Sequence, residues 1–109
     1  MTIRQISVRD VNAMLSAGTP VLLLDVREPE EHAFCHLPGS VLMPLGDLPT
    51  RWEELEVPDD AMVVVYCHHG VRSLRGAGFL EYVGIKNVAS MAGGIEEWSL
   101  AVDPTVPRY

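Results

Sequence analysis

Residues 63–73, VVVYCHHGVRS, join a run of apolar side chains to a short polar segment. A continuous apolar run of this length is typical of a strand that is buried on both faces, as in a parallel sheet. The run ends at Tyr66, and Cys67 follows at its tip. A helical pattern begins at Ser73, so the stretch predicts a strand, a loop over residues 67–72 and then a helix.

The same alternation continues on both sides of this stretch. Ser7 is a predicted N-cap and Gly18 a predicted end for the first helix. The expected strands are residues 3–6, 20–26, 41–45, 62–67 and 87–91. The expected helices are residues 7–18, 28–34, 47–55, 73–84 and 93–102. Strands that alternate with helices predict an α/β fold, with a parallel sheet and helices on both of its faces.

Three polar clusters follow predicted strands. They are residues 25–28 (DVRE), the loop after Tyr66, and residues 92–94 (AGG). Ligands in parallel α/β sheets bind beyond the carboxyl ends of the strands. We therefore expect these three clusters, which are distant in the chain, to meet at one edge of the sheet.

The loop after Tyr66 has the composition of an anion-binding site. Backbone N–H groups of a short loop that leads into a helix can converge on one point, and the helix N-terminus adds positive potential there. Such surroundings favour the thiolate form of Cys67. Gly70 permits close approach of the backbone, while Arg72, His68 and His69 are expected to add positive charge at the rim.

Simpler interpretations of these residues stay open. Cysteine is also common as a small apolar residue at the end of a core strand. Arg72 can be a solvated residue at the start of a helix, and the histidines can be exposed loop residues. A zinc site built from Cys35, His36, Cys67, His68 and His69 is disfavoured, because adjacent residues rarely reach one metal and no C-x-x-C spacing occurs. We therefore predict no metal.

Composition limits the possible partners. The chain has 109 residues, which is the size of a single domain, and 48% of them are apolar. Its net charge of -7 disfavours nonspecific binding to nucleic acid or to anionic lipid. No stretch approaches the ~18 apolar residues of a membrane span. The first residues, MTIRQISVRDV, have no apolar signal core, so a cytoplasmic location is expected.

Four segments together resemble the rhodanese-like domain family of sulfurtransferases. They are LLDVREPEEH (23–32), CHLPGSVLMPL (35–45), VVVYCHHGVRS (63–73) and KNVASMAGGIEEW (86–98). The resemblance runs from about Ile6 to Ala101 and implies a five-stranded parallel sheet, with residues 1–109 as one such domain. It also implies that Cys67 takes a sulfane sulfur from thiosulfate or a persulfide. The Cys67 persulfide then passes this sulfur to cyanide, a thiol or a protein acceptor, without a metal or an organic cofactor.

The resemblance also assigns roles around Cys67. Supporting positions near the pocket are Asp25, Arg27 and His36, and substrate-binding positions are His68, His69, Gly70, Val71, Arg72 and Ser73. The family often has arginine where this chain has His68. An unperturbed histidine titrates near pH ~6.5, so the charge at this position is expected to vary between about pH 6 and pH 8.

Cys35 stands where the family usually has glycine. A second thiol near the site would permit a disulfide with Cys67, but a small packed side chain is the favoured interpretation.

Other functions are compatible with parts of the pattern. Phosphatases and arsenate reductases of a related fold place one residue more between their cysteine and arginine than the four that separate Cys67 from Arg72. A shorter loop favours sulfur over a tetrahedral phosphate. A binding or sensor module without catalysis, or a persulfide carrier, is a further alternative. The tail segment, residues 103–109 (DPTVPRY), can dock a partner or pack on the domain.

Overall fold

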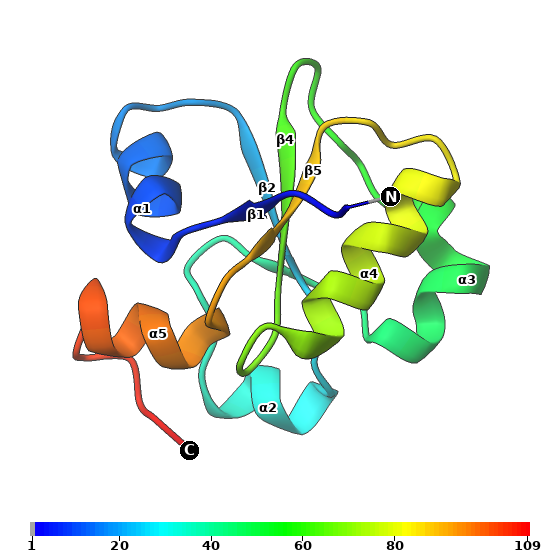
Figure 1. The fold of residues 1–109 in the computed structure, drawn as a ribbon. Coiled ribbons are helices and arrows are strands. Elements are labelled where there is room, and N and C mark those ends of the chain that lie inside the picture. Colours follow the sequence, from blue (N-terminus) through cyan, green and yellow to red (C-terminus); the bar gives the residue numbers. More distant parts are fainter. Residues whose placement is uncertain (1) are drawn as a thin grey trace.

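The computed structural model describes residues 2–109, and its centre is a parallel sheet. Five strands are ordered β1-β5-β4-β2-β3, and all neighbouring pairs run parallel. Their bounds are Gln5–Ile6 (β1), Val21–Asp25 (β2), Val41–Leu42 (β3), Met62–Tyr66 (β4) and Val88–Met91 (β5). The predicted five-stranded parallel sheet is therefore confirmed (Figure 1).

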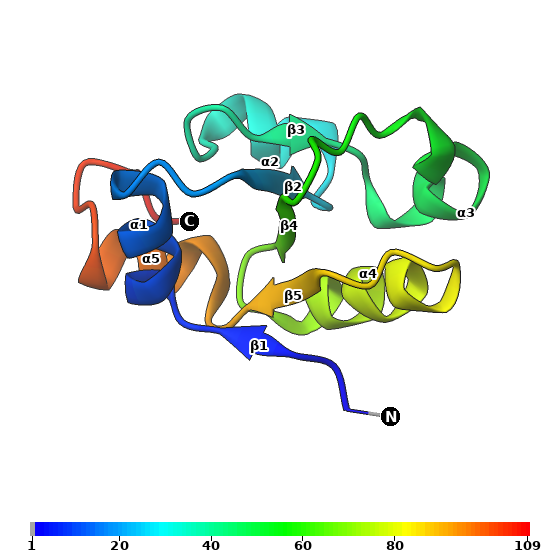
Figure 2. The same ribbon diagram turned by 90° about the horizontal axis from the view of Figure 1, so that it is seen from above.

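Helices cover both faces of the sheet, as predicted. The α-helices are Val8–Ser16 (α1), Pro29–Phe34 (α2), Leu48–Arg51 (α3), Val71–Tyr82 (α4) and Gly94–Ala101 (α5). Seen from above, α1 and α5 lie on one side of the sheet, and α3 and α4 lie on the other (Figure 2). Among residues 2–109, no helix combines the length and the apolar composition that crossing a membrane requires.

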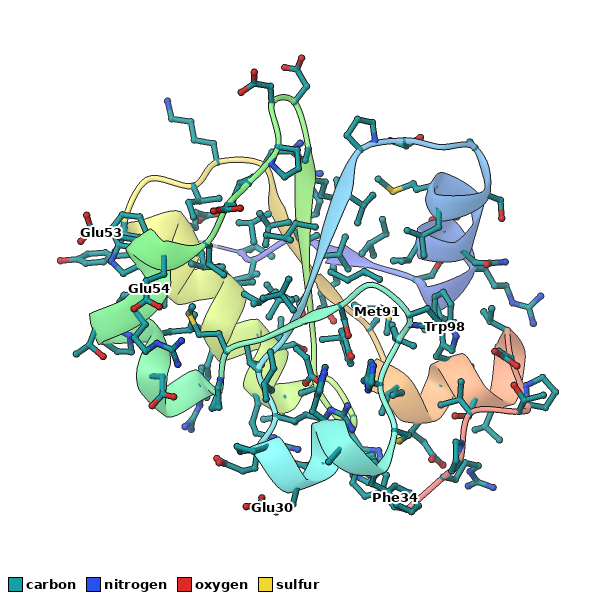
Figure 3. The ribbon with its side chains drawn as sticks, turned by 180° about the vertical axis from the view of Figure 1, so that it is seen from behind. Glu30, Phe34, Glu53, Glu54, Met91 and Trp98 are labelled. Carbon is teal, nitrogen blue, oxygen red and sulfur yellow. The ribbon has the colours of Figure 1, made fainter. Side chains whose placement is uncertain are left out.

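Strand β4 explains why the apolar run has no polar alternation. Val64 and Tyr66 belong to the core cluster under α1 and α5, whereas Val63 and Val65 belong to the cluster under α3 and α4. Successive side chains of a strand point to opposite faces, and here both faces are buried. Trp98 of α5 also belongs to the first cluster (Figure 3).

The ends of the helices differ in part from the predicted bounds. Ser7 caps α1 as expected, because its Oγ accepts the N–H of Asp10 at 3.1 Å. Helix α4 begins at Val71 rather than at Ser73. Gly70 precedes it with a φ of 106°, so the turn is completed earlier than the sequence pattern suggested.

The single helix expected over residues 47–55 is also wrong. The chain there forms α3 between two 3₁₀ turns, η1 (Leu45–Asp47) and η2 (Trp52–Glu54). Backbone bonds such as Leu55 N–H to Trp52 O close these tighter turns. A segment this short forms few i→i+4 hydrogen bonds, so a continuous α-helix is only weakly favoured. Its position depends on Leu48, which is fully buried.

Candidate active site

Cys67 directly follows β4, at the edge of the sheet where the carboxyl ends of β2 and β4, helix α2 and the tail segment also lie (Figure 1). Its Sγ accepts the backbone N–H groups of Gly70 at 3.1 Å and Ser73 at 3.3 Å. The Ser73 hydroxyl lies 3.5 Å from the same sulfur. The donors thus converge on the sulfur, and this arrangement suits an anionic sulfur better than a neutral one.

Helix α5 holds the loop in this shape. The N–H groups of Ile95 and Glu96 bind the carbonyl oxygens of Cys67 at 2.9 Å and of His68 at 3.1 Å. These carbonyls therefore face α5, which leaves loop N–H groups free to face the sulfur. Gly94 has a φ of 63°, and a Cβ on it would collide with both carbonyl oxygens. The AGG cluster is therefore a close backbone contact between α5 and the loop.

A second serine, Ser90, forms a hydrogen bond with the Ser73 hydroxyl beside the Cys67 sulfur. The Oγ atoms of Ser73 and Ser90 lie 2.7 Å apart, and both residues are completely buried. Ser90 belongs to β5 and was missed by the sequence reasoning. The available signal was a hydroxyl inside an apolar strand that is buried on both faces, since such a group needs a hydrogen-bond partner.

Asp25 and Arg27 form a fully buried ion pair at the end of β2. Arg27 donates Nε to Asp25 Oδ1 at 2.9 Å and Nη2 to Oδ2 at 2.7 Å. It also donates Nη2 to the carbonyl oxygen of Cys35 at 2.6 Å. Burial alone would raise the pKa of Asp25, but hydrogen bonds from Arg27 and His32 outweigh burial and lower this pKa. The pair therefore fastens the segment after α2 to the sheet edge.

Arg72 is paired, although it was expected to be a free charge at the rim. Its Nη1 and Nη2 donate to Glu31 Oε1 at 2.7 Å and Oε2 at 2.9 Å. Hydrogen bonding from Arg72 is the main reason why the pKa of Glu31 falls to about 2. Much of the Arg72 charge is therefore compensated by Glu31, a residue on α2 that the sequence reasoning did not select.

His68 also differs from the expected rim charge. Its ring lies 3.8 Å from the ring of Tyr109 in a parallel stack and 3.9 Å from the ring of His69. Its Nε2 is buried and has no hydrogen-bond partner within residues 2–109. Burial, and next the neighbouring His69, lower the pKa of His68. His68 is therefore neutral near pH 7, whereas the sequence alone suggested a titrating charge.

This edge combines a cysteine whose sulfur accepts two backbone N–H groups, a buried Asp25–Arg27 pair and a glycine contact from α5. The family model of the rhodanese-like domain matches residues 7–101, which contain all three features. The chain belongs to the rhodanese-like domain family. The family resemblance seen in the sequence is thus confirmed.

Individual relatives of this rhodanese-like domain are sulfurtransferases. It is 36% identical over 95 residues to the adenylyltransferase and sulfurtransferase uba4 of Ogataea parapolymorpha, which covers 87% of this chain and 24% of that protein. It is 32% identical over 97 residues to a sulfurtransferase of Allochromatium vinosum, which covers 89% of each. The crystal structure of a thiosulfate sulfurtransferase from Pseudomonas aeruginosa has a TM-score of 0.85 and 29% identity, and the match covers 97% of this chain and 20% of that one.

These relatives support sulfur transfer in general as the activity of a rhodanese-type enzyme. The chain spans most of the Allochromatium protein but only a minor part of the Ogataea and Pseudomonas proteins.

Cys35 and His36 lie beside the site rather than against the sulfur of Cys67. Cys35 is buried, and its Sγ donates to the carbonyl oxygen of Pro107 at 3.4 Å. Both Cys35 and Cys67 are free thiols. His36 bonds the carbonyl oxygen of His32 through Nδ1 at 2.9 Å, and the two rings stack. Within residues 2–109, no group of three or more candidate ligands is placed to hold a metal ion.

The tail segment packs on the domain and reaches the site, which answers the question that its sequence left open. Val106 is buried in the core cluster under α1 and α5. The Tyr109 hydroxyl accepts a hydrogen bond from Arg27 Nη1 at 2.9 Å and donates one to Glu31 Oε2 at 2.6 Å. No pattern in the sequence pointed to Tyr109, because its partners lie far away in the chain.

Proposed function

We propose that this rhodanese-like domain moves a sulfane sulfur from thiosulfate or a small persulfide to a thiol, cyanide or protein acceptor. The observation that carries the proposal is the pair of backbone N–H groups on the Cys67 sulfur. Donors of this kind stabilise a thiolate before the reaction, and they are already oriented, so no reorganisation is needed as charge moves.

The reaction has two displacement steps. The Cys67 thiolate attacks the sulfane sulfur of thiosulfate, a new S–S bond forms, and sulfite leaves with the electron pair of the broken S–S bond. An acceptor thiolate or cyanide then attacks the outer sulfur of the Cys67 persulfide. The Cys67 thiolate leaves with the electrons of that bond, and the domain returns to its starting state without gain or loss of electrons.

We assign the loop residues by what they contribute. Gly70 and Ser73 supply the N–H groups, and the backbone of His68, His69 and Val71 carries the turn between them. Asp25 and Arg27 act indirectly, because they hold the neighbouring segment in place. Arg72 lies in the first turn of α4, directly after the loop, but its ion pair with Glu31 weakens its attraction for a donor.

The same ion pair argues against phosphatase chemistry. A phosphoryl group needs a cation that clamps its oxygens as charge develops. Arg72 directs both terminal nitrogens to Glu31, so its fork is occupied. The compact loop, whose sulfur already accepts two N–H groups, fits a sulfur atom better than a tetrahedral phosphate.

The deciding experiment is mass spectrometry of the intact protein and of its peptides after incubation with thiosulfate or glutathione persulfide. We expect one added sulfur on the Cys67 peptide, removal of that sulfur by cyanide, and thiocyanate as the product. Cys67→Ser is the matched control, because it removes the nucleophile with little change in volume. Sulfur uptake by folded Cys67→Ser, or none by the parent, would refute the proposal. Hydrolysis of p-nitrophenyl phosphate by the parent would favour the phosphatase alternative.

A further inference from the structure

The tail segment returns to the mouth of the site after α5. It is attached at several points along its way. Val106 is buried, Pro107 O accepts the Cys35 thiol, and Arg108 forms an ion pair with Glu96 of α5 at 2.6 Å. Figure 3 shows Phe34 of α2 beside the tail segment, and its ring meets the ring of Tyr109 edge-on. The tail segment is thus held against the domain by contacts at each residue from Val106 to Tyr109.

Tyr109 contacts three of the elements that surround Cys67. Its ring is stacked on His68 of the loop, and its hydroxyl bridges Arg27 at the end of β2 and Glu31 of α2. Glu31 in turn holds Arg72. One side chain therefore connects the catalytic loop, the sheet edge and helix α2, which are distant in the chain.

The Cys67 sulfur is closed off in this arrangement. Cys67 is only 1% exposed, so a donor reaches the sulfur only after some part of the mouth moves. The loop is held by α5, and Arg27 is buried in a bidentate ion pair. Tyr109 is 45% exposed, so its hydroxyl and ring contacts can be exchanged for contacts with water. It is therefore the neighbour that can move without unfolding the loop or separating a buried ion pair.

We propose that Tyr109 is the gate of the site and determines which sizes of molecule reach Cys67. This inference rests on the proposed function in one respect, namely that Cys67 is the reacting sulfur. With the ring on His68, the mouth is closed. When the ring leaves His68, Glu31 and Arg27, the mouth opens, and a small donor needs a smaller opening than a bulky one.

The test compares the rates at which two thiol reagents of different size modify Cys67. Iodoacetamide is the small reagent and fluorescein maleimide the bulky one, and peptide mass spectrometry separates Cys67 from Cys35. Tyr109→Ala should raise the maleimide rate about tenfold or more, and the iodoacetamide rate by only about two- to threefold, because loss of the ring widens the mouth permanently. Tyr109→Phe keeps the ring but loses both hydroxyl contacts, so its rates should fall between those of the parent and Tyr109→Ala.

Tyr82→Ala is the matched control, because Tyr82 is 87% exposed on α4 and should leave both rates unchanged. Thermal unfolding of each variant shows whether the fold is intact. Equal acceleration for the two reagents would indicate general loosening and overturn the gate, as would unchanged rates in folded Tyr109→Ala. Alkylation needs no sulfur transfer, so the gate can hold while persulfide formation fails, and persulfide can form while the gate fails.

Discussion

Arg72 and His68 lie in and directly after the loop that begins at Cys67. Neither supplies an uncompensated positive charge that would attract a dianionic donor. Arg72 shares its charge with Glu31, and burial lowers the pKa of His68. The attraction that remains comes mainly from backbone N–H groups, which bind anionic sulfur through dipoles and hydrogen bonds rather than through a full positive charge. At the level of single residues, this supports our proposal that a small persulfide can serve as the donor as well as thiosulfate.

His68→Arg should raise kcat/KM for thiosulfate by about tenfold, which corresponds to ~1.4 kcal/mol. A unit charge roughly 6 Å from the donor contributes up to ~2–3 kcal/mol at an effective dielectric of ~20, and less after screening by solvent and salt. The guanidinium can stack on Tyr109 in place of the imidazole. Thiocyanate formation, measured between about pH 6 and pH 8, gives the ratio of variant to parent at each pH.

Toward pH 6 this ratio should decline less than it would for an unperturbed histidine. The lowered pKa of His68 moves protonation of the native side chain to lower pH, so the parent gains less charge there than an ordinary histidine would supply. His69→Arg is the control, because His69 is the exposed neighbour and receives the same added charge. An equal gain in His69→Arg, or a ratio that declines toward one near pH 6, would contradict the role given to His68.

At the level of elements, the contact between α5 and the loop after β4 determines the shape of the candidate site. The first turn of α5 binds the carbonyls of Cys67 and His68, so the helix N-terminus determines which way the loop amides face. Gly94 makes this contact possible, because a side chain there would occupy the space of the loop carbonyls.

Gly94→Ala should therefore destabilise the protein by at least ~2 kcal/mol more than Gly18→Ala. Both glycines have positive φ, 63° at Gly94 and 72° at Gly18, but a Cβ on Gly18 would meet nothing within 4 Å. The backbone strain is similar, and the difference reports the collision with the loop. Urea unfolding measures stability, and persulfide formation on Cys67 measures loop geometry. Equal effects of the two substitutions would show that α5 does not shape the loop.

The whole molecule is joined at one edge by a network of charges that links β2, α2, α4 and the tail segment. Its carboxylates are Asp25, which is buried, and Glu31, whose side chain is 19% exposed. The pKa of each lies below its ordinary value in the folded protein, and that of Glu31 falls from 4.5 to about 2. Protons therefore bind more readily to these groups in the unfolded chain than in the folded protein.

The contribution of these carboxylates to the free energy of unfolding should accordingly be complete above the ordinary carboxyl pKa. It should be lost as the pH falls from about 4.5 toward 2. Glu31→Gln should make this decrease shallower. Glu30→Gln should not, because Glu30 lies on the same helix but points into solvent (Figure 3). Urea unfolding at several pH values measures the slope. Identical slopes for the two variants would refute the contribution of Glu31.

The sequence by itself determined the features that depend on neighbours in the chain. The apolar run before Cys67 predicted a doubly buried strand, and the alternation of strands and helices predicted the parallel sheet. The motif around Cys67 also placed a cysteine at the start of a polar loop, with Gly70 at the turn. These predictions succeeded because hydrophobic periodicity and turn chemistry act within a few residues.

Only the tertiary structure decided how the site is charged and covered. Arg72 meets Glu31 from 41 positions away, and Tyr109 meets Arg27 from 82 positions away. Whether a charge is free or paired, and whether a thiol is open or closed, depends on which distant side chains the packing of the elements brings together. Local patterns carry no record of such partners, since the pairing exists only after β2, α2, α4 and the tail segment have assembled at one edge.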